Sequence, residues 1–128
     1  MPIFSVYIAA LVLQSLLAVH GPLASGKQAE ESATKADLVY SVLDANPDLF
    51  TVCPDKSVRS RMNLCFRIKG GDEAAEKAFL AGAEKRGLLG LKGHRSVGGI
   101  RASNYNAVPV DNVRKLRQWL DDFIKEIK

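Results

Sequence analysis

Apolar positions follow a helical period over the first part of the chain. From Ile3 to Val19 nearly every residue is apolar, which predicts a helix that is covered on most of its sides. From Ala29 to Leu43 the apolar residues recur about every 3.6 positions, which is typical of a helix with one buried face. Gly21 and Pro22 lie between these stretches and are expected to interrupt the helix. The pattern therefore predicts two successive helices.

The middle of the chain has a strand-like pattern. Phe50–Cys53 and Met62–Lys69 carry β-branched and aromatic residues that partly alternate with polar ones, which predicts two strands of one sheet. The sequence Asn-Pro-Asp at Asn46–Asp48 predicts a turn before the first strand. Pro54–Ser57 provides turn residues between the two strands.

A third helix and two more strands are predicted next. Asp72 can cap a helix over Glu73–Arg86, because its carboxylate accepts hydrogen bonds from the free N–H groups of the first turn, and Gly87 can end that helix. Leu88–Leu91 and Ile100–Tyr105 are then predicted to be strands, joined by a glycine-rich loop.

An amphipathic helix is predicted to close the chain, beginning between Pro109 and Asp111. Its apolar side chains recur on one stripe: Val110, Val113, Leu116, Leu120, Phe123, Ile124 and Ile127. Trp119 lies beside this stripe and is expected to pack rather than to bind a ligand. The order of elements predicts the α+β class, an α/β two-layer sandwich in which helices cover one face of a small, mostly antiparallel sheet.

Composition indicates one ordinary soluble domain. The chain has 128 residues, of which 47% are hydrophobic and 25% charged. Its net charge of +4 weakly favours anionic ligands, but the basic residues alternate with acidic ones on predicted helix surfaces, which indicates a solvated face for most of them. The sequence contains no aromatic-rich RNA-binding signature and no helix-turn-helix pattern, so we expect no nucleic acid partner.

The cysteines do not have the spacing of a metal or redox motif. Cys53 and Cys65 form no CxxC pair, and no histidine lies beside either of them, so no metal site is expected. Both fall in predicted strands, and we expect two buried, reduced thiols. A disulfide between neighbouring strands would require an oxidising compartment.

The apolar segment Ile3–Val19 also resembles a signal-peptide core or a short membrane span. Its flanks argue against both, because no Lys or Arg precedes it, Gln14 interrupts it, and no small-x-small cleavage site follows it before Gly21. A helix buried within a larger protein explains the same pattern.

The segment Lys92–Ser103, KGHRSVGGIRAS, concentrates the chemistry of the chain. One Lys, one His and two Arg share it with three glycines. Guanidinium groups bind phosphate or carboxylate through paired hydrogen bonds, imidazole adds a donor, and glycine lets main-chain N–H groups approach a ligand. A turn whose basic side chains project into water gives the same sequence, so both interpretations stay open. The Walker and GxGxxG spacings are absent, which argues against a nucleotide site.

Three stretches of the chain carry a resemblance to a known family. The sequence KGHRSVGGIRASNYNA, at Lys92–Ala107, closely resembles the signature near the carboxyl end of phosphoserine aminotransferases. Arg59–Asn63, RSRMN, resembles that family's RSxMN at the start of a strand, and Pro2–Tyr7, PIFSVY, is similar to the helix start after its Thr-Pro-Pro turn. The resemblance spans nearly the whole chain and corresponds to roughly the last third of the family's length.

The resemblance implies a fold and a location. The family consists of fold-type I pyridoxal-phosphate enzymes that form homodimers, so residues 1–45 are expected to bridge a large and a small domain and residues 46–128 to form the small α+β domain. Ile3–Val19 is then an internal helix packed between domains, with no signal peptide and no membrane contact. A cytoplasmic location is implied as well.

The resemblance also implies a reaction and roles for three residues. The family transfers an amino group between L-glutamate and 3-phosphohydroxypyruvate, giving 2-oxoglutarate and phosphoserine in serine biosynthesis. Arg101 looks like the arginine that holds the substrate α-carboxylate. His94 and Arg95 look like part of the pocket for the substrate phosphate.

The same resemblance implies what this chain lacks. No segment is similar to the surroundings of the lysine that forms the Schiff base with pyridoxal 5'-phosphate, so we expect no catalytic residue and no cofactor-binding residue here. The chain alone is then expected to be inactive. The alternative, from another class, is a stand-alone module that binds anions or phosphorylated metabolites without catalysis.

Overall fold

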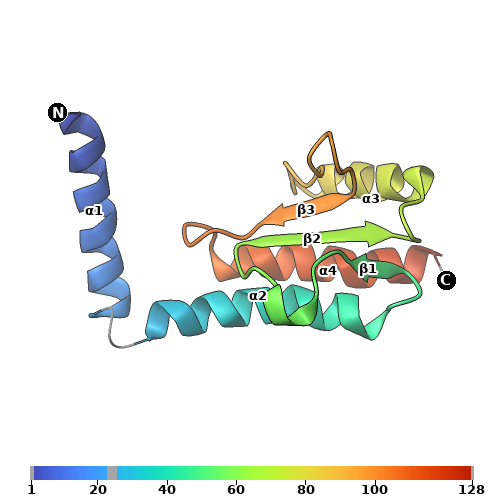
Figure 1. Ribbon diagram of the computed structural model, residues 1–128, viewed down its shortest axis with the longest axis horizontal. Helices are drawn as coiled ribbons and strands as arrows, with labels where there is room; N and C mark the ends of the chain where they lie inside the picture. The colour runs from blue at the N-terminus through green and yellow to red at the C-terminus, as the bar shows by residue number, and fades with distance from the viewer. Residues whose placement is uncertain (1, 23–25, 128) are drawn as a thin grey trace.

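The computed structural model describes residues 2–22 and 26–127. Along the chain the helices and strands are α1 (Ile3–His20), α2 (Lys27–Ala45), β1 (Phe50–Val52), the short 3-10 helix η2 (Lys56–Val58), β2 (Asn63–Ile68), α3 (Glu73–Lys85), β3 (Ile100–Ser103) and α4 (Val110–Ile127) (Figure 1). The predicted α+β class is confirmed, and the predicted helices differ from the observed ones only at their ends.

The sheet is antiparallel, with the strand order β1-β2-β3. Along β2, the side chains of Leu64, Phe66 and Ile68 are fully buried, whereas Cys65 and Arg67 between them are partly exposed. This alternation follows from the two-residue period of a strand and gives the sheet an inner and an outer face. The outer face carries the outward-pointing residues Thr51, Cys53, Cys65, Arg67, Arg101 and Ser103.

Helices α2, α3 and α4 cover the inner face, and aromatic side chains connect α3 and α4 to it. Phe79 of α3 contacts Phe66, Trp119 and Phe123, with ring centroids 5.1–5.9 Å apart. Trp119 is 1% exposed, and its indole N–H donates to the carbonyl of Phe79 at 3.2 Å, which confirms that it packs in the core. A Cβ on Gly82 would lie 2.4 Å from the Trp119 ring, so glycine at this position lets α3 and α4 approach closely.

One predicted strand is absent. Leu88–Leu91 does not form a strand, and the only pairing nearby within the described residues is an isolated bridge between Lys92 and Ile100. The reason is the backbone of Gly87, just before the segment, and of Gly90, within it, whose φ angles of 75° and 73° are left-handed and interrupt an extended conformation. The segment still lies along β3, because the N–H of Arg101 donates to the carbonyl of Leu91 at 2.8 Å.

The predicted burial of the two thiols is wrong. Cys53 is exposed and Cys65 half-buried, and both are free. They lie side by side on the outer face, where the N–H of Cys53 donates to the carbonyl of Cys65 at 3.1 Å. Their positions in the strand alternation, out of phase with the buried Phe50 and Phe66, account for the exposure.

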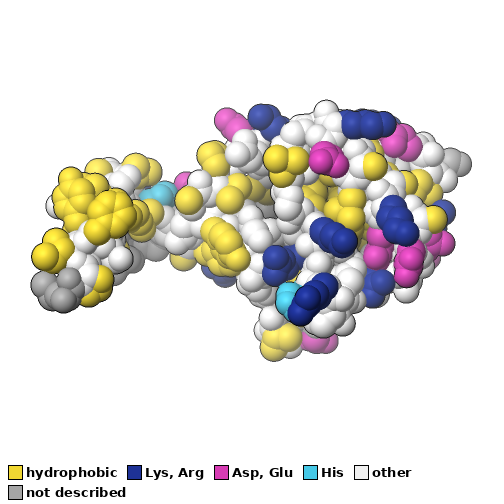
Figure 2. Space-filling model, turned by 90° about the horizontal axis from the view of Figure 1, so that it is seen from above, with side chains coloured by type: hydrophobic (Ala, Val, Ile, Leu, Met, Phe, Trp, Pro, Cys, Tyr) yellow, Lys and Arg dark blue, Asp and Glu magenta, His cyan; other side chains and the backbone are white. Residues whose placement is uncertain are grey.

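Helix α1 lies apart from the sheet and its helices (Figure 1), and none of its residues is buried. Figure 2 shows hydrophobic side chains over this part of the molecule. With 18 residues and a mean hydropathy of 2.0, α1 is long and apolar enough to cross a membrane. Signal sequences and core helices of larger soluble proteins have the same length and composition.

Candidate functional site

The segment that concentrates the basic residues folds as a closed turn next to β3. We call residues 93–99 the glycine loop. Its ends meet where the N–H of Gly93 donates to the carbonyl of Gly99 at 2.8 Å, and its tip is held by the N–H groups of Val97 and Gly98, which donate to the carbonyl of His94 at 2.9 and 2.7 Å. The loop is therefore a compact structure with its own hydrogen bonds.

Glycine is required at both ends of this loop. A Cβ on Gly93 would lie 2.0 Å from the carbonyl oxygen of Gly98, which no real structure tolerates. Gly98 and Gly99 have φ angles of 74° and 76°, a conformation that other residues rarely adopt. The three glycines that the sequence placed here are thus explained by the closure of the loop.

His94 is exposed at the tip of the glycine loop, and its hydrogen bonds indicate the tautomer of its imidazole ring. Its Nδ1 lies 2.7 Å from the Oγ of Ser96 and accepts the main-chain N–H of Ser96 at 3.3 Å. A main-chain N–H can only donate, so Nδ1 is the acceptor and the neutral ring carries its proton on Nε2. The imidazole therefore has an Nε2–H donor available for an anion.

The two arginines of the segment differ in their surroundings. Arg95 is exposed at the tip of the loop, beside His94. Arg101 lies on the outer face of β3, opposite Cys65, and is half-buried. Its Nε is buried and has no hydrogen-bond partner among the residues that the structure describes. A buried guanidinium N–H without an acceptor is costly, and a bound carboxylate would supply that acceptor.

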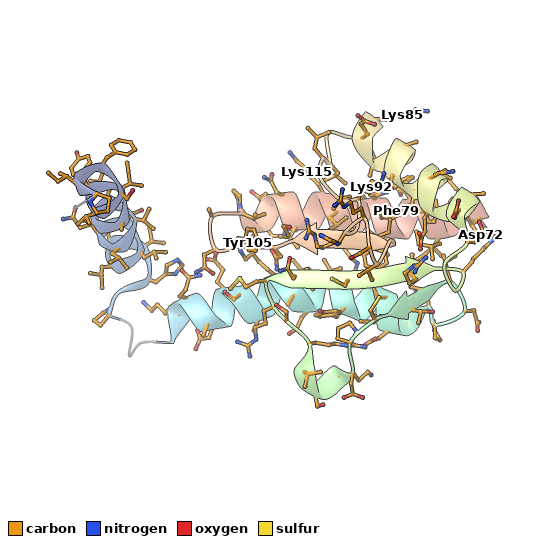
Figure 3. All side chains as sticks on the ribbon, turned by 45° about the horizontal axis from the view of Figure 1, so that its top comes forward. Asp72, Phe79, Lys85, Lys92, Tyr105 and Lys115 are labelled. Carbon is orange, nitrogen blue, oxygen red and sulfur yellow. The ribbon has the colours of Figure 1, made fainter. Side chains whose placement is uncertain are left out.

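The structure thus brings His94, Arg95 and Arg101 to one segment, with two of them on the loop and the third on the strand that directly follows it. Lys92 is exposed and forms an isolated bridge with Ile100 at the base of the loop. In Figure 3, Lys92 lies near the beginning of β3 and Tyr105 beyond its far end.

The residues after β3 are held by contacts that the sequence did not reveal. Lys35 of α2 is fully buried, and its Nζ donates to the carbonyls of Tyr105 and Val108, each at 2.9 Å. Asn104 is also buried and donates through Nδ2 to the carbonyl of Arg61 at 3.0 Å. These contacts fix the exit of β3 on the inner side of the molecule, away from the glycine loop.

The stretch RSRMN contributes an ion pair of the scaffold. Arg59 donates two hydrogen bonds to the Asp44 carboxylate, at 2.8 and 2.9 Å, and lies over the Tyr40 ring at 4.8 Å. These hydrogen bonds from Arg59 hold the pKa of Asp44 below its usual value. The pair joins the end of α2 to the segment that leads into β2, which is a structural role.

One residue next to the site was missed by sequence reasoning. Arg67 of β2 donates through Nε to the Glu76 carboxylate at 2.7 Å and through a terminal nitrogen to the carbonyl of Val97 at 3.3 Å. The alternation of β2 could have placed Arg67 on the outer face, but its contact with the glycine loop depends on how the two segments pack. Among the described residues no group of His, Cys, Asp and Glu could hold a metal ion.

None of the profiles that define protein families matches the chain. Single relatives and solved structures do match it, and those described here are all phosphoserine aminotransferases. The chain is 45% identical over 122 residues to the phosphoserine aminotransferase of Burkholderia vietnamiensis, covering 95% of this chain and 32% of that protein. The solved phosphoserine aminotransferase of Bacillus circulans subsp. alkalophilus matches with a TM-score of 0.88 at 38% identity, over 99% of this chain and 34% of the other.

A pyridoxal-phosphate-bound phosphoserine aminotransferase from Trichomonas vaginalis matches with a TM-score of 0.81 at 38% identity, over 94% of this chain and 33% of the other. The chain thus spans about a third of the length of the curated relatives it matches. Because the Bacillus match leaves out only about 1% of the chain, α1 is part of the shared fold.

Proposed function

From its membership of the phosphoserine aminotransferase family, whose carboxyl-terminal part it matches, we propose that this chain forms the small, substrate-binding domain of such an enzyme. The reaction is the transfer of an amino group between L-glutamate and 3-phosphohydroxypyruvate, giving 2-oxoglutarate and phosphoserine in serine biosynthesis. The observation that carries this proposal is the glycine loop with its adjoining strand, where an Nε2–H donor and two guanidinium groups lie on one segment.

Arg101 binds the α-carboxylate of the substrate in this proposal. Its side chain is on the outer face of the sheet, and its buried Nε has no protein acceptor among the described residues. A carboxylate approaching that face would accept from Nε and from a terminal nitrogen together, which is the paired geometry that guanidinium favours. The same contact would satisfy a donor that is otherwise buried without a partner.

His94 and Arg95 bind the substrate phosphate. Because Ser96 donates to Nδ1 of His94, the imidazole presents Nε2–H as a donor without needing to be charged. Arg95 next to it contributes a permanent positive charge. One imidazole N–H donor and one guanidinium at the tip of a loop rich in main-chain N–H groups suit a phosphate dianion.

Pyridoxal phosphate, the family's cofactor, would act as the electron sink of the reaction. In this proposal most of its site lies outside this chain. Lys35 is fully buried with its Nζ on two carbonyls, so it is not available for a Schiff base, and the segment 92–103 contains no acidic residue to pair with the pyridine nitrogen. The proposed role of this chain is therefore on the substrate side, and we expect the isolated chain to be inactive.

The remaining residues complete the proposed domain arrangement. Residues 1–45 bridge the large domain and the small domain of residues 46–128, with α1 packed between domains and its apolar surface covered. A helix that is apolar on all sides and has no buried residue in this chain supports that placement. In this arrangement the complete enzyme is a homodimer in the cytoplasm.

The test uses a chimera in which this chain replaces the matching carboxyl-terminal part of the Burkholderia vietnamiensis enzyme. Cofactor absorbance first establishes that the chimera is folded and loaded. We expect glutamate to form from phosphoserine and 2-oxoglutarate, and Arg101→Ala to abolish this activity while Arg114→Ala, an exposed arginine of α4, leaves it unchanged. A loaded chimera that ignores phosphoserine but accepts another amino acid would overturn the substrate assignment.

A further inference from the structure

The side chain of Arg67 is about one third exposed and lies against three separate segments. Its Nε donates to Glu76 of α3 at 2.7 Å, and its terminal nitrogen donates to the carbonyl of Val97 in the glycine loop at 3.3 Å. A Cβ on Gly99 would lie 2.6 Å from its Cδ, and a Cβ on Gly71 would lie 2.6 Å from a terminal nitrogen. The glycines of two loops therefore leave the space that this one arginine fills.

Glu76 anchors this arrangement to the body of the domain. It lies in the first turn of α3, is 8% exposed, and its Oε1 also lies 3.5 Å from the main-chain N–H of Ile68. A carboxylate this buried depends on its cationic partner, because burial of an unpaired charge is strongly unfavourable. The pair of Arg67 and Glu76 is thus a fixed point from which the arginine reaches the loop.

The contact with Val97 falls at the residue that shapes the tip of the loop. The N–H of Val97 donates to the carbonyl of His94 at 2.9 Å, while the carbonyl of Val97 accepts from Arg67. A continuous path of hydrogen bonds therefore runs from Glu76 through Arg67 and Val97 to His94. Residues 94–98 are exposed, and their other hydrogen bonds among the described residues lie within the loop and its base.

We propose that Arg67, held by Glu76, is a positioning residue that keeps the glycine loop in the conformation in which His94 and Arg95 meet a phosphate. This inference rests on the proposed function for the role of the phosphate. Loss of the contact leaves His94 and Arg95 in place but lets the tip of the loop move, so that a bound phosphate must order it. The expected consequence is weaker binding of the phosphorylated substrate with little change in the rate of the chemical step.

The first measurement is independent of any activity. In the 128-residue chain, hydrogen exchange of the Val97 and Gly98 amides is compared between the unmodified protein, Arg67→Ala and the control Arg114→Ala. We expect exchange at both amides to accelerate at least about fivefold in Arg67→Ala alone, while the amides in the centre of α4 keep their protection. Unchanged exchange at Val97 and Gly98 would overturn the proposal.

The second measurement separates positioning from simple charge. Glu76→Gln makes the protein more positive by one charge but removes the partner that holds Arg67. If Arg67 acted only through the electrostatic attraction of its charge, Glu76→Gln would lower the KM for phosphoserine in the chimera, because a nearby negative charge is removed. Positioning predicts the opposite, a KM raised about tenfold in both Arg67→Ala and Glu76→Gln, with kcat within about twofold.

Activity on L-serine completes the test, because L-serine carries neither a phosphate nor a side-chain carboxylate. Its kcat/KM should stay within about twofold in both variants if the effect passes through His94 and Arg95. An equal fall in kcat/KM for phosphoserine and L-serine would show general loss of structure and overturn the positioning role. A chimera with no phosphoserine activity before substitution refutes the proposed function instead, and amide exchange then decides whether Arg67 holds the loop.

Discussion

Helices α1 and α4 have the same length of 18 residues and opposite surroundings. α4 carries one apolar stripe, and that stripe is buried: Val113, Leu116, Trp119, Leu120, Phe123 and Ile124. α1 is apolar on all sides, and none of its residues is buried. The width of an apolar surface indicates how many sides of a helix are meant to be covered. The apolar stripe of α4 is therefore covered by the described residues, whereas the apolar surface of α1 is exposed.

The largest difference in the free energy of unfolding is expected between a buried side chain of α4 and an exposed side chain of α1. Phe123→Ala removes a ring that contacts both Phe79 and Trp119, and we expect it to lower the free energy of unfolding by about 3–5 kcal/mol. Leu13→Ala in α1, where the side chain is exposed, should change it by less than about 0.5 kcal/mol. Urea unfolding of the two variants measures both values. Equal losses would contradict the contrast.

A second prediction concerns association. An uncovered apolar helix drives contacts between copies, so the 128-residue chain should form oligomers at micromolar concentrations. Leu13→Glu with Leu17→Glu should shift the sedimentation profile toward the monomer. The matched pair Glu84→Gln with Lys85→Gln on α3, which is exposed and distant from α1, should leave it unchanged. A monomer before any substitution would contradict the placement of α1 between domains.

A smaller loss of stability is expected for α2. This helix has one packed side, as α4 does, but it also carries an ion pair near its end. Since Arg59 lowers the pKa of Asp44 in the folded chain, the pair stabilises the fold above the unfolded pKa of about 3.9, and this contribution is lost as the pH falls through the lower folded pKa. Asp44→Asn should therefore cost up to about 1 kcal/mol at pH 7. The difference from the unmodified chain should vanish below about pH 3, measured by urea unfolding across pH.

The smallest effect is expected on the outer face of the sheet. Cys53 is exposed, and no packing depends on its sulfur in the way that the core depends on Phe66. Cys53→Ser should change the free energy of unfolding by less than about 0.5 kcal/mol. A loss above about 2 kcal/mol would show that this face is packed in solution, and the distinction between the two faces would fail.

Local features of the fold were predictable because their causes are local. Asp72 caps α3 by accepting from the N–H of Ala75 at 2.8 Å, as its place before a helical pattern predicted. The alternation of β2 fixed which face of the sheet is buried. Leu88–Leu91 was predicted wrongly because its apolar residues outweighed two left-handed glycines, Gly87 just before the segment and Gly90 within it.

The residues of the candidate site could be proposed from the sequence, whereas the contacts that support them could not. The crowding of His94, Arg95 and Arg101 among glycines was compatible with an anion site or with a solvated turn, and the resemblance to phosphoserine aminotransferases suggested a role for each. The pairing of Arg67 with Glu76 brings together a strand and a helix, and its contact with Val97 adds a third segment. No periodicity in the sequence records contacts of that kind, because they depend on the packing of the whole domain.

The preference for a phosphorylated substrate tests the central claim most directly. In the loaded chimera, kcat/KM is measured for phosphoserine and for L-serine, which differ only in the phosphate, with and without His94→Ala and Arg95→Ala together. The glycine loop as a phosphate site predicts a strong preference for phosphoserine that falls at least about a hundredfold in the double variant, while the low activity on L-serine is kept. A preference that survives the double substitution would place the phosphate elsewhere and contradict the proposed role of the loop.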